Sequence, residues 1–263
     1  MPSVQAGELQ VGYDVEGNGF PLVVLHGASS SGREDFAAQL PAVRKSFRVY
    51  MPDARSHGRT RWDVADGFSQ PLLTGDLEAF VDALGLTTFH LLGFSMGAMT
   101  AMTFATRHPE RLRTLILVGI TPQREPRASV ARRLMDPERI QRDDPHWAAE
   151  LAARHDPVQG EGAWQRLMPS IAHDVATQPL LSPRELRAVT VPTLVAIGDR
   201  DPFVPVDHGW GLARQLPDAR LLVVPDCGHE VMTRQPALFN AALAGFYRST
   251  AAKAEDRVKE VAR

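Results

Sequence analysis

Short runs of apolar residues recur along the chain, and segments with a helical spacing of apolar positions separate them. Residues 9–15 alternate between apolar and polar side chains, which is typical of a half-exposed strand at the edge of a sheet. The later runs are continuous and rich in Val, Leu and Ile, as expected for strands covered on both faces in a parallel sheet. These runs are Leu22–Leu25, Phe47–Met51, Phe89–Leu92, Leu115–Val118, Thr193–Ile197 and Leu221–Val224.

Between the predicted strands, apolar residues recur with the spacing of one helix face. Strands that alternate with helices in this way are typical of a doubly wound α/β sheet. The predicted helices are Ser31–Lys45, Thr74–Leu84 and Met96–Arg107.

The alternation stops between about Thr121 and about Thr190, where no strand-like run occurs. The Asp144-Pro145 pair in this stretch is a favourable helix start, with an N-cap residue followed by proline. Apolar positions at helical offsets follow in Trp164, Leu167, Met168 and Ile171. The sequence therefore predicts a helical insertion between two strands of the sheet.

Composition and charge exclude several kinds of partner. The chain has 263 residues, 44% hydrophobic and 23% charged, as in ordinary globular proteins. A formal net charge of −2 gives no strong field to attract nucleic acid or an anionic membrane. The sequence has no signal-peptide pattern at its start and no apolar stretch of about 18 residues, so we expect no membrane span. The single cysteine, Cys227, favours a reducing compartment, and we expect a cytoplasmic protein.

Gly93-Phe94-Ser95-Met96-Gly97 has the pattern Gly-x-Ser-x-Gly and lies between a predicted strand and a predicted helix. A tight strand-to-helix turn needs small residues on both sides of the serine, because the serine backbone is strained there. Such a turn raises the serine hydroxyl above the sheet and points the helix N-terminus towards it. The pattern alone also fits an ordinary glycine turn, but its position makes Ser95 the candidate nucleophile.

A serine hydroxyl is a poor nucleophile and needs a base. His229 follows the last predicted strand, which places it at the same edge of the sheet as Ser95. Asp199 and Asp201 both follow the preceding strand. We assign Asp201 as the acid that orients the base and Asp199 as a turn or salt-bridge residue. The surface or the insertion is the expected place of His146, His155, His173 and His208.

Together these motifs resemble those of the α/β-hydrolase fold superfamily, in particular its capped, esterase and lipase-like serine hydrolases. The likeness extends from about Glu8 to Tyr247. Residues 25–28, Leu-His-Gly-Ala, resemble the family's oxyanion loop. Residues 53–60 resemble its Asp-x-Arg-Gly-His-Gly-x-Ser turn, with Ser56 in place of a glycine.

The resemblance implies a mostly parallel, doubly wound sheet of about eight strands, with a helical cap inserted after the sixth strand. It divides the chain into a core (1–120 and 191–250), a cap (121–190) and a C-terminal tail (251–263). The last residues, from Ser249 to Arg263, are small and charged, which indicates a helix extension or a frayed tail. It also implies an oxyanion hole made by the backbone amides of Ala28 and Met96. The physical chemistry agrees, because the first amides of a helix are free donors and the helix dipole favours an anion.

For the substrate pocket we select residues beside the catalytic candidates and aromatic residues of the cap. Apolar stripes on helices are more often simple packing, and a serine after the oxyanion loop equally suits a helix cap. The selected residues are Ser29, Phe94, Trp147, Trp164, Phe203 and Val204. The sequence has no phosphate loop, dinucleotide fingerprint or paired metal-ligand motif, so we expect no metal and no cofactor.

These features predict a serine hydrolase that cleaves a carboxylic ester or lactone of a small to medium apolar molecule through a Ser-His-Asp triad and an acyl-enzyme. Carbon–carbon bond hydrolysis and cofactor-free haloperoxidase or peracid chemistry on the same triad remain alternatives, as does a non-catalytic ligand-binding protein. Halide and epoxide hydrolysis are disfavoured, because those relatives carry aspartate where Ser95 stands. The sequence assigns no oligomeric state.

Overall fold

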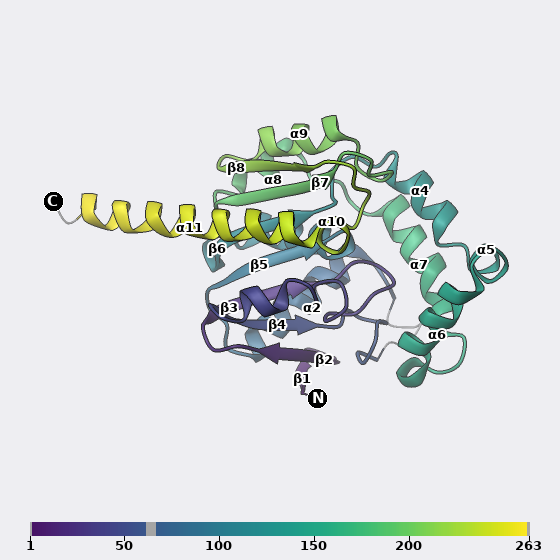
Figure 1. The fold of residues 1–263 in the computed structure, drawn as a ribbon. Helices are drawn as coiled ribbons and strands as arrows, with labels where there is room; N and C mark the ends of the chain where they lie inside the picture. Colours follow the sequence, from purple (N-terminus) through teal and green to yellow (C-terminus); the bar gives the residue numbers. More distant parts are fainter. Residues whose placement is uncertain (1, 62–66, 262–263) are drawn as a thin grey trace.

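The computed structural model describes residues 2–61 and 67–261 and is built around an eight-stranded sheet (Figure 1). The strand order is β1-β2-β4-β3-β5-β6-β7-β8. β2 is antiparallel to both β1 and β4, and the strands from β4 to β8 in this order are parallel to their neighbours. The mostly parallel, doubly wound sheet predicted from the sequence is therefore confirmed. The bounds are β1 Ser3–Ala6, β2 Leu9–Glu16, β3 Phe20–Leu25, β4 Phe47–Pro52, β5 Phe89–Phe94, β6 Leu112–Val118, β7 Thr193–Gly198 and β8 Ala219–Val224.

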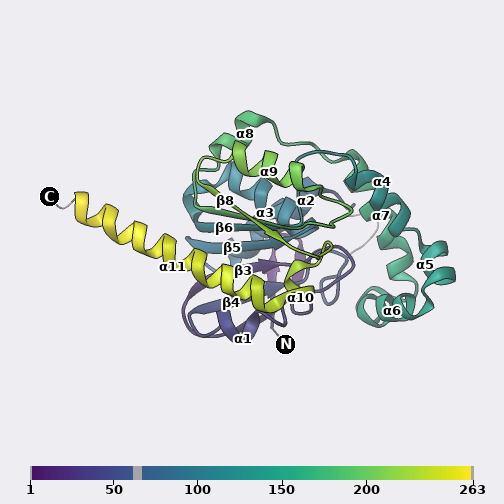
Figure 2. The same ribbon diagram turned by 45° about the horizontal axis from the view of Figure 1, so that its top comes forward.

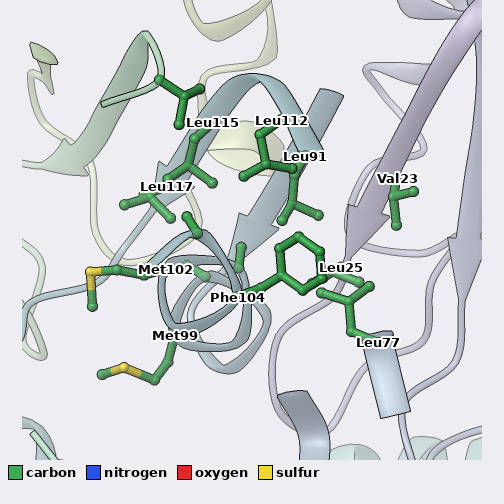
Figure 3. Packing of buried hydrophobic residues seen from close by; sticks show 14 of the residues in the cluster. Val23, Leu25, Leu77, Leu91, Met99, Met102, Phe104, Leu112, Leu115 and Leu117 are labelled. Carbon is green, nitrogen blue, oxygen red and sulfur yellow. The ribbon is translucent and has the colours of Figure 1, made fainter. Parts of the chain in front are cut away.

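Helices cover both faces of this sheet (Figure 2). On one face lie α2 (Gln70–Ala83), α3 (Met96–Arg107), α8 (Pro183–Ala188) and α9 (Val206–Gln215). On the other lie α1 (Leu40–Val43), α10 (Val231–Arg234) and α11 (Pro236–Val261). Side chains alternate along a strand, so Val23 of β3 enters the first core and Leu22 enters the second. Figure 3 shows the first core, where Met102 and Phe104 of α3 pack among leucines of β5 and β6.

The segment between β6 and β7, which we call the cap, is helical as predicted. Figure 1 shows α4–α7 gathered beyond one end of the sheet, whereas α11 extends beyond the opposite end. Asp144 caps α6, because its side chain accepts a hydrogen bond of 3.0 Å from the Trp147 amide. The cap helices bury a small apolar core of their own around Leu151 and Trp164. The cap contains α4 Arg127–Leu134, α5 Pro137–Asp143, α6 Pro145–Gln159, α7 Ala163–Thr177 and the short α8. Outside the cap, a 3-10 turn at Pro109–Arg111 precedes β6.

Two predicted elements differ from the structure. The alternating strand at residues 9–15 is not at the edge, because β1 pairs with it on the outer side. The helix predicted over Ser31–Lys45 is mostly turns and contains only α1. Pro41 accounts for this difference, since proline removes a backbone donor and clashes with the preceding helical turn, so a helix here begins only next to it.

The C-terminal residues, for which a helix extension or a frayed tail is expected, continue α11 as far as Val261. Within the described ranges, no helix combines the length and apolar character needed to cross a membrane.

Candidate active site

Ser95 lies in the tight turn between β5 and α3 and has the left-handed φ of 50° with ψ −109°. A side chain on either neighbouring glycine would collide with backbone. A Cβ on Gly93 would lie 2.3 Å from the Gly97 carbonyl oxygen, and a Cβ on Gly97 would lie 2.4 Å from that of Leu25. The Ser95 amide donates to the Val118 carbonyl at 2.8 Å. These contacts explain why the turn needs glycine on both sides, and they hold the serine at the end of the central strands.

His229 and Asp201 reach Ser95 from the turns that follow β8 and β7. The Ser95 Oγ lies 2.9 Å from His229 Nε2, and His229 Nδ1 lies 2.8 Å from Asp201 Oδ2. The Asp201 side chain is fully buried, and its Oδ1 accepts hydrogen bonds from the amides of Phe203 and Val204 at 2.8 and 3.1 Å. The carboxylate therefore holds the proton on His229 Nδ1 and leaves Nε2 free to accept the serine proton.

The His229 ring is packed between two aromatic rings. Its centroid lies 4.9 Å from that of Phe94 and 4.4 Å from that of Phe203. Gly119 closes the third side, since a Cβ there would come within 2.9 Å of the imidazole. Asp199 accepts from the Cys227 amide at 3.0 Å and so fixes the turn that carries the histidine. This packing leaves the imidazole little freedom to leave Ser95.

The amides of Ala28 and Met96 border the same space. Among the described residues, neither amide donates a hydrogen bond to another group of the chain. The Gly97 amide donates to the His26 carbonyl at 3.1 Å, which ties the start of α3 to the loop that contains Ala28. Two free donors beside a serine hydroxyl are suited to stabilise a negatively charged oxygen.

A cavity of about 660 Å³ opens above Ser95, between the sheet and the cap. Four predicted pocket residues line it, namely Ser29, Phe94, Trp147 and Phe203. The other two do not. Trp164 is packed inside the cap core, because the apolar face of α7 turns most of its residues towards the other cap helices. Val204 is buried beneath the Asp201 turn, where its amide holds the carboxylate.

Part of the wall of this cavity is polar, which was not predicted from the sequence. Arg127 of α4 and Asp174 and Gln178 at the end of α7 line it, and each is at most 5% exposed. Arg127 Nη2 and Gln178 Oε1 are buried without a hydrogen-bond partner in the described structure. Burial lowers the pKa of Arg127 to about 10 and raises that of Asp174 to about 6. A signal was present, because Arg127 shares a helix face with Val130, Ala131 and Leu134.

His155 lies in the insertion, as expected, within α6. Its side chain is fully buried at the junction of cap and core, and the Gly58 amide donates to its Nδ1 at 3.1 Å. Its partners are about 100 residues away in the chain, so no local pattern indicates its burial.

Comparison with known proteins places the chain in a family of enzymes. A 2-hydroxy-6-oxo-6-phenylhexa-2,4-dienoate hydrolase from Comamonas testosteroni is 28% identical, with 90% of each chain covered. A solved N-acyl homoserine lactone degrading enzyme is 27% identical, covers 93% of this chain and all of its own, and has a TM-score of 0.75. The fold also matches a meta-cleavage product hydrolase from Pseudomonas fluorescens IP01, with a TM-score of 0.78, 22% identity, and coverage of 95% and 98%. A family model matches residues 22–242, and the chain belongs to the alpha/beta hydrolase family.

Proposed function

We propose that this hydrolase transfers the acyl group of a carboxylic ester or lactone to water through Ser95. The observation that carries the proposal is the continuous series of contacts from Asp201 to His229 to Ser95, at 2.8 and 2.9 Å, beside two free amides in one cavity. A nucleophile within hydrogen-bond reach of a base, with the base oriented by a buried acid, is the arrangement that acyl transfer requires.

In the proposed reaction, Ser95 Oγ attacks the substrate carbonyl carbon while its proton passes to His229 Nε2. The carbonyl oxygen becomes negative and accepts hydrogen bonds from the amides of Ala28 and Met96, each of which contributes about 2.7–4 kcal/mol to the transition state. Asp201 stabilises the charged imidazole. His229 then gives the proton to the leaving alkoxide as its bond to the acyl carbon breaks. Water, deprotonated by His229, attacks the acyl-enzyme, and Ser95 regains its proton as the acid leaves.

The cavity favours a substrate with a polar group besides the reacting bond. Its volume of about 660 Å³ lies within the range of about 300–1,000 Å³ that is usual for small-molecule sites. Met99, Trp147 and Ile171 contribute apolar wall, whereas Arg127 contributes a buried cation. Arginine suits a carboxylate, which accepts two parallel hydrogen bonds from a guanidinium. We therefore propose an acyl group that ends in a carboxylate or a comparable acceptor.

Carbon–carbon bond hydrolysis is the second candidate. The relative from Comamonas testosteroni is named for a dienoate, and a dienoate bears the carboxylate that Arg127 would bind. The same serine, base and amides would serve this reaction, with carbon in place of oxygen as the leaving atom.

Two p-nitrophenyl esters of matched length test the proposal, the pentanoate and the glutarate monoester, which differ by a terminal carboxylate. We expect turnover of both, preference for the glutarate in kcat/KM, and loss of turnover in Ser95→Ala. Arg127→Met should remove the preference, whereas Arg132→Met, at an exposed position of the same helix, should keep it. If both esters remain intact while a 6-oxo-dienoate is cleaved, the second candidate replaces the first. Ester turnover that survives Ser95→Ala contradicts both.

A further inference from the structure

Three buried histidines contact the backbone between Gly27 and Ser30, where the oxyanion loop ends. His26, His57 and His155 are 2%, 0% and 0% exposed, and their rings form a row. The ring centroids of His26 and His57 are 5.0 Å apart, and those of His57 and His155 are 5.4 Å apart. The first two histidines belong to the core, whereas His155 comes from α6 of the cap.

Each histidine bonds to a different one of three successive peptide groups. His26 Nδ1 lies 2.7 Å from the Gly27 carbonyl, in the peptide that also carries the Ala28 amide. The Ser29 amide donates to His57 Nε2 at 3.3 Å. The Ser29 carbonyl lies 3.3 Å from His155 Nε2 and also accepts from Arg154 Nη1 at 2.8 Å. Because a peptide group is planar, the contact with the Gly27 carbonyl also orients the Ala28 amide, and the contacts with the next two peptides hold the chain that follows.

The remaining ring nitrogens set the proton positions. The Ala54 amide donates to His26 Nε2 at 2.9 Å, and the Gly58 amide donates to His155 Nδ1 at 3.1 Å. His57 Nδ1 faces the Arg55 carbonyl at 2.9 Å. A neutral imidazole has one donor and one acceptor, so all six contacts are satisfied by a single tautomer of each ring. The proton lies on Nδ1 of His26 and His57 and on Nε2 of His155.

The surroundings keep His57 and His155 neutral. Burial lowers the pKa of His155 to about 4, and the Arg154 cation acts in the same direction, whereas the hydrogen bond to the Ser29 carbonyl and the Glu34 carboxylate have smaller, opposite effects. Burial, His26 and His155 hold the pKa of His57 well below its usual range. Ser29 itself has φ 65°, a conformation that a serine adopts only when its surroundings impose it.

We propose that His155 is a positioning residue. It completes this row of histidines, so that the orientation of the Ala28 amide depends on the packing of the cap against the core. This inference rests on the proposed hydrolysis through Ser95, because that reaction uses the Ala28 amide. The cap in this view is part of the catalytic framework as well as a wall of the pocket.

Two variants distinguish the hydrogen bonds of the His155 ring from the space that the ring fills. His155→Phe keeps the ring beside His57 but removes both hydrogen bonds, whereas His155→Gln retains a donor for the Ser29 carbonyl. We expect His155→Phe to lower kcat by roughly 10-fold to 100-fold, since losing one oxyanion donor costs about 10²–10³. KM should change little, and His155→Gln should recover most of the rate. His146→Phe, at an exposed position of the same helix, should leave both constants unchanged. A folded His155→Phe enzyme with wild-type kcat, or with a change in KM alone, would overturn the proposal.

A second measurement does not depend on catalysis. Long-range ¹H–¹⁵N NMR of the intact protein at pH 7 reports which nitrogen of each histidine carries the proton. We expect protons on Nε2 of His155 and on Nδ1 of His26 and His57. The opposite tautomers, or a charged His155, would refute the proposed hydrogen bonds between these rings and the backbone. Labelling of Ser95 by a fluorophosphonate distinguishes the two proposals. A wild-type protein that is not labelled but has the expected tautomers refutes acyl transfer and leaves the histidine contacts intact.

Discussion

Replacement of Gly97 by alanine tests the oxyanion hole by moving its backbone. The added Cβ would lie 2.4 Å from the Leu25 carbonyl oxygen and 2.6 Å from that of His26, whereas ordinary contact begins at 3.4 Å. The first oxygen belongs to Leu25, the last residue of β3, where this central strand pairs with β5, and the second belongs to the residue that follows. The strand therefore cannot yield, and the start of α3 must move away by about 1 Å.

This movement separates the Met96 amide from the Ala28 loop. A displacement of about 1 Å at a catalytic group costs roughly 100-fold in rate. We expect Gly97→Ala to lower kcat for p-nitrophenyl esters by about that factor, with KM changed far less, because the cavity walls stay in place.

The matched control is Gly75→Ala in α2, where no atom lies within 4 Å of the added Cβ. It should keep wild-type kcat and raise the free energy of unfolding by up to about 1 kcal/mol, since alanine favours helix. Circular dichroism identifies any loss of folding in Gly97→Ala. A folded Gly97→Ala enzyme within threefold of the wild-type kcat would refute the proposed role of these amides.

Three further predictions follow from the contacts of single side chains. Asp201→Asn places an amide against His229 Nδ1 and should lower kcat by about 10⁴ without unfolding the protein, and a loss below tenfold in steady-state assays would contradict the role of this acid. Asp144→Ala removes the cap of α6 and should lower the free energy of unfolding by about 1 kcal/mol in urea titrations, with kcat unchanged. His155 stays neutral in the folded protein down to about pH 4, whereas the unfolded chain binds this proton near pH 6.5. The free energy of unfolding should therefore fall between these values as pH falls, by up to about 1.4 kcal/mol per pH unit for this one proton. His155→Gln should reduce that slope, and parallel wild-type and variant curves would contradict the burial effect.

The strand-end positions of the three catalytic candidates are visible in the sequence. Continuous apolar runs predict parallel strands, and the ends of parallel strands share one edge of the sheet, so Ser95, Asp201 and His229 are expected close together. Gly93 and Gly97 mark the turn because a Cβ at either position would collide with backbone atoms. The physics that places these residues acts over a few neighbours in the chain, which is why a local pattern predicts them.

The cap residues are harder to predict because their surroundings come from distant segments. The apolar spacing of Trp164 identifies a buried helix face, but it does not say whether that face meets the substrate or other helices. His155 depends on Ser29 and Gly58, and Arg127 on α7, and neither contact is encoded by spacing within a helix. Pro41, by contrast, is a local signal against a long helix. The prediction of a helix over residues 31–45 gave more weight to the apolar spacing than to this proline.

The order of strands also determines how the enzyme loses activity. Ser95 follows β5 near the middle of the sheet, whereas His229 follows β8, which lies at the edge and is only partly buried over most of its length. Edge elements open at a lower free energy than central ones. In rising denaturant or temperature, amide hydrogens of β8 should therefore exchange with solvent before those of β5. Hydrolysis should cease while most of the helical circular dichroism signal persists. Loss of activity therefore reports the opening of β8 at the edge of the sheet and not the unfolding of the whole molecule.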